Sequence, residues 1–434
     1  MSPELIGVLG LITLLVVITM GVPIGIALGL VGLAGIAIII SPEAALIKIG
    51  VVSFDVVSRY DLGVLPLFLL MAHLCFAAGA SRDFFDVAAR FIGHRRGGLA
   101  LASVAGCAGF GAISGSSLAT VATVGSAALP EMRKAGYDPG FACGALAAGG
   151  TLGALIPPSG ALIVFGIIAE QSIGRLFAAA IVPGLTQAMF YMFAISVLCY
   201  FRPALAPSSK RVGMRDRLAS LVKIIDIFFL VVLVIGGLTI GWFTPTEAAS
   251  VGVALALVLC AIRGALHVSV LVKAFVETLR TSGMIYLIII GAMLFATFIS
   301  ITGIAEFMSN LVLDLDAGPV TAVIVMAILF LVLGSFLDGL ALMLLVTPIF
   351  LPIAVELGYS PIWFGIFLVR AMEVGFILPP LGLNAYIIHG IAKDIELSAI
   401  FKGIGPFLIA DVLHLGLIIA LPVMVLWLPS VVGV

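Results

Sequence analysis

Two stretches of the sequence place hydroxyl groups and helix-breaking prolines inside apolar segments. The first, residues 110–158, opens with FGAISGSSLATVATVG and closes with GGTLGALIPPS. Pro157 and Pro158 supply no N–H groups and disturb helical pairing upstream, so carbonyl oxygens in residues 153–156 are expected to be free. Free carbonyls and hydroxyls are hard oxygen ligands that suit a small cation such as sodium. The half-helix that begins near Ser159 offers N–H groups and a positive dipole end, which suit a carboxylate.

The same plan recurs in the second half of the chain, as LGSFLDGLALMLLVTP and EVGFILPPLGLN. Pro157 matches Pro379 and Gly153 matches Gly375 at one constant offset, without a gap. The chain therefore reads as a duplication with one re-entrant helical hairpin and one broken helix in each half. The predicted parts are a first repeat at 1–201 with hairpin 98–130 and broken helix 139–170, a cytoplasmic linker at 202–223, and a second repeat at 224–434 with hairpin 320–352 and broken helix 361–392.

The composition indicates an all-α integral membrane protein. Of 434 residues, 63% are hydrophobic and only 10% are charged, as expected for repeated spans of about 20 apolar residues. Threading the chain predicts roughly ten crossings plus the two hairpins, with both termini outside the cytoplasm. Irregular backbone at membrane depth is tolerated only where protein or a water-filled cavity surrounds it. The net charge of −1 gives no indication of a nucleic-acid partner.

Charge predicts that the two repeats are inverted. Loop 81–97 carries four arginines, whereas its counterpart 303–319 carries Glu306, Asp314 and Asp316 and no basic residue. Because short loops rich in Lys and Arg stay cytoplasmic, the two loops are expected on opposite sides of the membrane. Inverted repeats with discontinuous helices are typical of secondary transporters, whose substrate and ion sites lie near the midplane.

Four polar residues fall within apolar segments of the second half: Asp338, Arg370, Glu373 and Asn384. Such residues are costly in lipid and are usually paired or functional. Arg370 and Glu373 stand three residues apart on a predicted helix and could neutralise each other, or Arg370 could bind a substrate carboxylate. Asp411 and His414, also at helical spacing, are equally open to a packing or a functional interpretation.

Six motifs, in this order, carry a resemblance to a known family: FIGHRRGGLA, AISGSSLAT, ALPEMRKAGYDP, GTLGALIPPS, FTPTEAA and ILPPLGLN. With them the chain resembles, over nearly its whole length, the large DctM-like membrane subunit of TRAP (tripartite ATP-independent periplasmic) transporters. The resemblance implies an elevator-type, sodium-driven importer of organic acids in the bacterial inner membrane. It also implies two partners, a periplasmic substrate-binding protein and a separate small four-helix membrane subunit.

The resemblance implies two sodium sites as well. The first would use Ser114 and Ser117 with backbone near Gly153, Ile156 and Pro158. The second would use backbone near Gly334 and Gly375, with Leu378 and Leu381. The predicted substrate contacts are Ser116, Ser159, Asp338, Arg370 and Asn384.

Two departures from the family pattern accompany these assignments. Leu378 stands where the family usually has a threonine, which removes a hydroxyl from the second sodium site. Arg370 and Glu373 stand where mostly apolar residues are expected.

Other functions are open to the same sequence. A proton-coupled exporter of organic anions would have the same architecture and could titrate Asp338, Glu373 or Asp411. An intramembrane hydrolase would need a base beside its serine, and no histidine lies near ISGSS in the sequence. The chain is therefore predicted not to be an enzyme. The small residues of the hairpin could also serve only for close helix packing.

Overall fold

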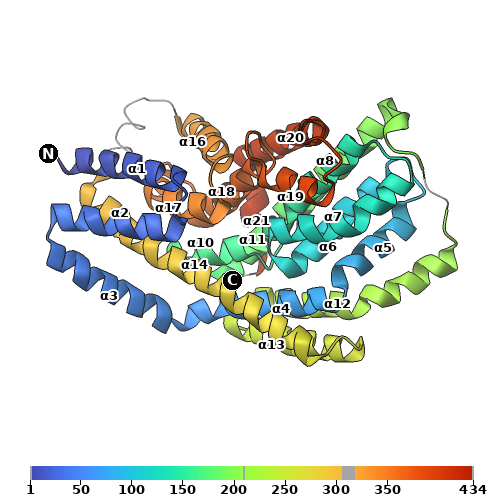
Figure 1. The fold of residues 1–434 in the computed structure, drawn as a ribbon, viewed down its shortest axis with the longest axis horizontal. Helices are drawn as coiled ribbons and strands as arrows, with labels where there is room; N and C mark the ends of the chain where they lie inside the picture. The colour runs from blue at the N-terminus through green and yellow to red at the C-terminus, as the bar shows by residue number, and fades with distance from the viewer. Residues whose placement is uncertain (1, 209–210, 305–317, 433–434) are drawn as a thin grey trace.

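The computed structural model describes residues 2–208, 211–304 and 318–432, and these ranges contain helices and no strand (Figure 1). The predicted acidic loop residues Glu306, Asp314 and Asp316 lie outside the described residues. The helices of the first half are α1 (Pro3–Thr19), α2 (Ile24–Ile39), α3 (Pro42–Ser58), η1 (Tyr60–Gly63), α4 (Val64–Ala77), α5 (Ala80–Ile92), α6 (Gly98–Ser114), α7 (Ser117–Lys134), α8 (Pro139–Gly150), α9 (Leu152–Leu155), α10 (Gly160–Ile168), α11 (Ile173–Phe201) and η2 (Pro203–Leu205). Those of the second half are α12 (Met214–Ile240), α13 (Pro245–Ile262), α14 (Val268–Thr302), α16 (Gly318–Gly334), α17 (Gly339–Glu356), α18 (Pro361–Gly375), α19 (Leu383–Ile391), α20 (Leu397–Ala420) and α21 (Val423–Val432).

The duplication is visible in the helix bounds. Helix α7 runs from Ser117 to Lys134 and α17 from Gly339 to Glu356. Both pairs of ends are separated by the same offset as the two proline pairs. The same offset relates the first residue of α8, Pro139, to the first residue of α18, Pro361. Each half thus contains a helical hairpin, α6–α7 or α16–α17, followed by a helix that stops at a proline pair.

Seven helices in the described ranges are long and apolar enough to cross a membrane, and the bent pair α8–α9 and α10 would make an eighth. The two parts of that pair meet at 41°. Helices α1 and α2 have 17 and 16 residues, and segment 361–392 divides into α18 and α19, so these three fall below the length of a single complete span. The described helices therefore agree with a multi-pass membrane protein, while the number of ten crossings stays a prediction.

Two segments differ from their expected secondary structure. Residues 81–97 were expected as a loop, but α5 occupies most of this segment and packs on α6. Its charges lie on one side of an amphipathic helix, which a search for uninterrupted apolar runs overlooks. Residues 264–280 carry scattered charge, which predicts an interfacial helix, and the apolar run 281–300 predicts a span after it. They instead contribute to the single helix α14, 35 residues long, because no proline interrupts them.

Further differences concern the linker and the C-terminal region. The predicted linker 202–223 ends in helix, since α12 already begins at Met214. The apolar run near 406–428 predicts one last span, but the structure divides it between α20 and α21, because Pro422 cannot continue the preceding helix.

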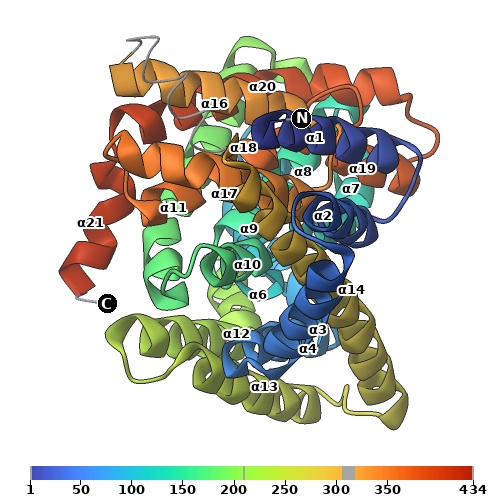
Figure 2. The same cartoon turned by 90° about the vertical axis from the view of Figure 1, so that its left-hand side faces the viewer.

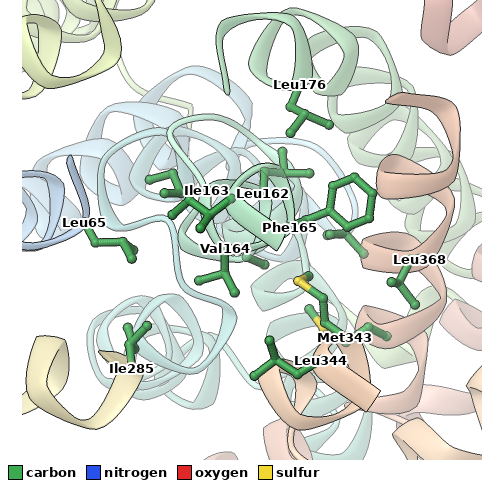
Figure 3. Close-up of a cluster of buried hydrophobic side chains, with 14 of the residues drawn as sticks. Leu65, Leu162, Ile163, Val164, Phe165, Leu176, Ile285, Met343, Leu344 and Leu368 are labelled. Carbon is green, nitrogen blue, oxygen red and sulfur yellow. The ribbon is translucent and has the colours of Figure 1, made fainter. Parts of the chain in front are cut away.

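The short helix α10, which follows the first proline pair, lies near the middle of the molecule (Figure 2). Its residues from Ala161 to Ile167 are all buried. Figure 3 shows the apolar side chains around it, among them Leu65 of α4, Ile285 of α14, Met343 of α17 and Leu368 of α18. This enclosure holds the first break in place between helices of both halves.

Glycines allow the backbones of two helix pairs to come into direct contact. Helix α14 runs beside α2, where a Cβ on Gly25 would lie 2.9 Å from the Ile288 backbone (Figure 1). Helix α20 lies against α8, and a Cβ on Gly403 would press into the backbone of Gly140. Small residues are the usual means of close helix packing in membranes, where lipid is as apolar as the side chains.

The Gly403 contact gives a first prediction. Gly403→Ala should lower the melting temperature of the purified protein, because its methyl group meets backbone, and overpacking costs about 1–3 kcal/mol. Gly405→Ala is the matched control on the same helix, since nothing lies within 4 Å of its Cβ position. Equal melting temperatures for the two variants would contradict the close packing of α8 and α20.

Candidate functional site

The tip of the first hairpin lies directly against the first helix break. Helix α6 ends at Ser114, and Gly115 follows in the left-handed region with φ of +59°. Its carbonyl accepts a hydrogen bond of 3.2 Å from the N–H of Gly160. A Cβ on Gly115 would lie 2.5 Å from the carbonyl oxygen of Pro158, so glycine is required both for the backbone conformation and for the close approach.

The break leaves carbonyl oxygens free, but not the whole set expected in residues 153–156, because the carbonyl of Ala154 accepts from Ser159. The peptide bond between Pro157 and Pro158 is cis. Within the described ranges, no donor is found for the carbonyl oxygens of Ile156 or Pro158. Ser159 begins α10, where its hydroxyl accepts from the N–H of Leu162 at 3.3 Å and donates to the carbonyl of Ala154.

A first group of oxygen atoms surrounds the hydroxyl of Ser114. This hydroxyl lies 2.8 Å from that of Thr120 and 3.4 Å from the carbonyl oxygen of Ser116. Gly153 closes the group from the broken helix, because a Cβ there would lie 2.6 Å from the same Ser116 oxygen. We call Ser114, the Ser116 carbonyl, Thr120 and Gly153 the Ser114 group.

The hydroxyl of Ser117 faces a different set of groups. It lies 2.6 Å from Oε2 of Glu373 and 3.1 Å from the carbonyl oxygen of Gly150. The amide nitrogen of Asn384 donates to it at 3.3 Å and to the carbonyl of Ala147 at 3.1 Å. The tip of the first hairpin is thus connected to α18 and α19 of the second half.

The second hairpin repeats the contact with its own broken helix. A Cβ on Gly375 would lie 2.8 Å from the Cα of Gly334, so the structure brings together these two predicted backbone positions. Leu378 is half-buried, whereas Leu381 is exposed, as are Pro379 and Pro380. The second break is therefore more open than the first, whose two prolines are buried.

A central cavity of about 280 Å³ lies where these elements meet. The tips of both hairpins line it, with Ser114, Ser116 and Ser117 from one and Asp338 from the other. The remaining lining comes from the first break and from α4, α14 and α18, the last of which contributes Glu373. The described lining carries two carboxylates and no lysine, arginine or histidine.

Arg370 forms an ion pair with Asp411, not with Glu373. It is fully buried, and its Nη2 donates to Oδ1 of Asp411 on α20. Its Nε donates to Nδ1 of His414 at 3.3 Å. The ion pairs found among the described residues do not include one between Arg370 and Glu373, so the direct partner of Arg370 is Asp411 and its charge reaches Glu373 only through space.

Asp411 also gathers donors from the first half of the chain. Its Oδ1 accepts from Tyr191 at 2.5 Å and from Gln187 at 2.8 Å, both on α11. The Tyr191 hydroxyl shares a further hydrogen bond of 2.8 Å with Thr151, next to the first break. We call Thr151, Gln187, Tyr191, Arg370, Asp411 and His414 the Arg370 network.

The predicted site residues therefore fall into separate places. Those that line the cavity are Ser114, Ser116, Ser117, Pro158 and Asp338. Ser159, Arg370 and Asn384 were predicted as substrate contacts, but they are fully buried and lie outside the described lining. Ile156 packs against Gly184 of α11, because a Cβ placed on Gly184 would lie 2.7 Å from the side chain of Ile156.

Sequence reasoning missed Thr120 and the position of Glu373 at the cavity. Thr120 could have been found, because it lies in the same hydroxyl-rich run four residues after Ser116 and bonds to its carbonyl at 2.8 Å. The link between Glu373 and Ser117 spans 256 residues, and no local pattern in the sequence indicates it.

Fold and site together define an α-helical integral membrane protein with a central small-molecule cavity, of the kind that transports solutes. The family profile of the "Tripartite ATP-independent periplasmic transporter, DctM component" matches residues 11–424. The chain belongs to this family, which confirms the resemblance seen in the motifs and the prediction of a multi-pass protein of the bacterial inner membrane.

Individual relatives agree with that assignment. The "C4-dicarboxylate TRAP transporter large permease protein DctM" of Pseudomonas aeruginosa is 36% identical over 94% of each chain. The "Sialic acid TRAP transporter large permease protein SiaM" of Vibrio cholerae is 29% identical over 94% of this chain and 95% of that one. These relatives are transporter permeases, in agreement with the prediction that the chain is not an enzyme.

Among solved structures, the chain is similar to the YdaH transporter of Alcanivorax borkumensis, with a TM-score of 0.61 and 17% sequence identity. The similarity covers 88% of this chain and 89% of that one. At this identity it supports the fold alone.

Proposed function

We propose that the chain is the large permease subunit of a sodium-coupled transporter that takes up a small organic acid. Its substrate is delivered by a periplasmic substrate-binding protein, and a separate small membrane subunit completes the complex. The two halves act as inverted repeats, and their hairpins and broken helices move together across the membrane in an elevator-type cycle.

The oxygen atoms at the first break fit a sodium ion by their chemistry. The Ser114 group offers two hydroxyls and backbone carbonyls, and the carbonyls of Ile156 and Pro158 have no described donor. Hard oxygen ligands such as hydroxyls and carbonyls are what small alkali and alkaline-earth cations prefer. The described residues contain no cluster of three His, Cys, Asp or Glu side chains that would favour a transition metal. Gly334 and Gly375 approach each other in the same way at the second break, where a second sodium site is part of this proposal.

The charge of the cavity is the observation that carries the proposal. Asp338 and Glu373 line it and no basic side chain does. An organic anion that enters such a space meets like charge, and at low dielectric the repulsion is large. Bound cations would reverse the sign of the local field, so that anion binding depends on cation binding. This dependence is the thermodynamic basis of coupled transport.

The relatives supply the class of substrate. Several of their names describe transporters of C4-dicarboxylates, sialic acid and isethionate, which are small organic anions, and another names ectoine, whose carboxylate belongs to a zwitterion. One of them, the "Isethionate TRAP transporter permease protein DctMQ" of Oleidesulfovibrio alaskensis, is longer, and the match covers 59% of its length.

Uptake by proteoliposomes tests the proposal. The complex of this chain with its small subunit is reconstituted, and the binding protein is added outside with radiolabelled succinate as the first of a panel of organic acids. Uptake should require the binding protein and an inward sodium gradient. Uptake that proceeds without sodium and follows an imposed proton gradient would overturn sodium coupling.

That second outcome would favour the alternative function, a proton-coupled transporter or exporter of organic anions. The observation in its favour is that two carboxylates, Asp338 and Glu373, line the cavity and could carry protons. The same vesicles distinguish the two functions, because exchange of sodium for choline at constant pH affects only a sodium-coupled transporter.

The Ser114 group gives a prediction for the cation. Ser114→Ala should raise the half-saturating sodium concentration for uptake by about tenfold, which corresponds to about 1.4 kcal/mol for one lost ligand. Ser126→Ala is the matched control, since this exposed serine of α7 bonds only to the carbonyl of Thr123. An unchanged sodium dependence of Ser114→Ala would mean that this end of the hairpin serves packing alone.

A further inference from the structure

The side chain of Glu373 is buried in a place that leaves one of its oxygens without a partner. Glu373, Asn384 and Ser117 are 0%, 0% and 3% exposed. Oε2 of Glu373 meets the Ser117 hydroxyl, but no partner is found among the described residues for its Oε1 or for Oδ1 of Asn384. We call Ser117, Gly150, Glu373 and Asn384 the Glu373 cluster.

Unpaired buried oxygens are rare because each one forfeits its hydration without a replacement. Here two of them belong to side chains that both reach the same hydroxyl, that of Ser117. The carbonyl of Gly150 adds a third kind of oxygen at 3.1 Å from that hydroxyl. The cluster therefore contains more acceptors than its donors can satisfy, as expected around a bound cation.

The balance of charge leads to the same conclusion. Arg370 is the nearest basic residue along α18, but its guanidinium is committed to Asp411. Arg370 acts on Glu373 only through space, since no ion pair of Glu373 is found in the described part of the chain, and the carboxylates of Asp411 and Asp338 oppose it with negative charge. A buried carboxylate without a compensating cation is strongly disfavoured.

We propose that the Glu373 cluster binds one monovalent alkali cation, sodium, in addition to the site at the Ser114 group. The ligands are the carboxylate of Glu373, the amide oxygen of Asn384, the hydroxyl of Ser117 and the carbonyl of Gly150. A single carboxylate neutralises a single positive charge, whereas a divalent ion would leave an uncompensated charge in an apolar surrounding. The choice of sodium rests on the proposed function.

The placement of the ligands gives this cation a role. Ser117 begins α7 in the first hairpin, Gly150 ends α8, and Glu373 and Asn384 lie on α18 and α19 of the second half. A cation here joins the two broken helices to one hairpin tip. It would keep these helices of the two halves in contact during the elevator-type movement. It also places one positive charge beside the cavity where the anion binds.

Direct binding of ²²Na⁺ to the purified complex of this chain with its small subunit tests the inference. Glu373→Gln, which preserves shape and removes charge, should lose one phase of sodium binding, with at least a tenfold rise in its half-saturating concentration. Asn384→Ala should weaken the same phase and serves as the second variant if Glu373→Gln fails to fold. Ser114→Ala should weaken the other phase and leave this one intact.

Glu131→Gln is the matched control, because Glu131 is an exposed carboxylate of α7 that pairs with Lys134. If Glu373→Gln and Asn384→Ala bind as much sodium as the wild type, with the same affinity, the inference is overturned while sodium-coupled uptake stands. If the wild type binds no ²²Na⁺ and takes up substrate without sodium, the proposed function fails as well. Displacement of the Glu373-dependent phase by Mg²⁺ or Ca²⁺, but not by Li⁺, would overturn the choice of a monovalent ion.

Discussion

Arg370→Met should strongly destabilise the protein, because it leaves the carboxylate of Asp411 buried without its counter-charge. Removal of one partner from a buried ion pair typically costs about 3–5 kcal/mol. Asp411 would retain its bonds from Tyr191 and Gln187, but neither donor carries a charge. The melting temperature of the purified protein should therefore fall well below that of the wild type.

A second substitution tells which carboxylate is the true partner. Arg370→Met/Asp411→Asn should recover most of the lost stability, since the charge is gone and an oxygen remains for Tyr191 and Gln187 to bind. Arg370→Met/Glu373→Met should recover none, because Glu373 bonds to Ser117 and is not the ion-pair partner of Arg370. The double-mutant cycle isolates the pairwise energy. Recovery in the Glu373 double variant alone would contradict the pairing described here.

The contrast between Arg370 and Glu373 also marks the limit of local sequence reasoning. Three residues apart on one helix, they were expected to lie on the same face, where they could neutralise each other or Arg370 could bind a substrate carboxylate. Their side chains instead serve different neighbours, Arg370 towards α20 and Glu373 towards α7. Which neighbour lies on which side of α18 depends on tertiary packing, and the spacing within α18 carries no information about it.

Other features were predictable because their causes are local. The positions of the two hairpin tips and the two breaks follow from glycine, serine and paired prolines, whose backbone preferences act within a few residues. The constant offset between the two halves needs only comparison of the sequence with itself. Helix α5 also has a local signal, because its charges lie on one side of an amphipathic helix, but their number makes the segment look like a polar loop when only uninterrupted apolar runs are considered.

Gly153→Ala should abolish sodium-dependent uptake in a protein that still folds. The added methyl group would lie 2.6 Å from the carbonyl oxygen of Ser116 and 2.9 Å from Cβ of Thr120, closer than carbon atoms approach in proteins. It would therefore displace the oxygen atoms of the Ser114 group, where the first sodium ion is proposed to bind.

The position of Gly153 makes this effect local. The residue lies in the short helix α9, where its backbone conformation suits alanine, so the substitution removes no left-handed turn and should not unwind the helix. Gly390→Ala is the matched control, since Gly390 also lies in a helix, α19, is not among the cavity-lining residues, and has nothing within 4 Å of its Cβ position. The control should transport normally.

Uptake, ²²Na⁺ binding and melting temperature are measured together for both variants. Normal sodium binding by Gly153→Ala would remove Gly153 from the cation site. A large fall in melting temperature with sodium binding unchanged would assign its close contact with Ser116 and Thr120 to packing of the hairpin on the broken helix.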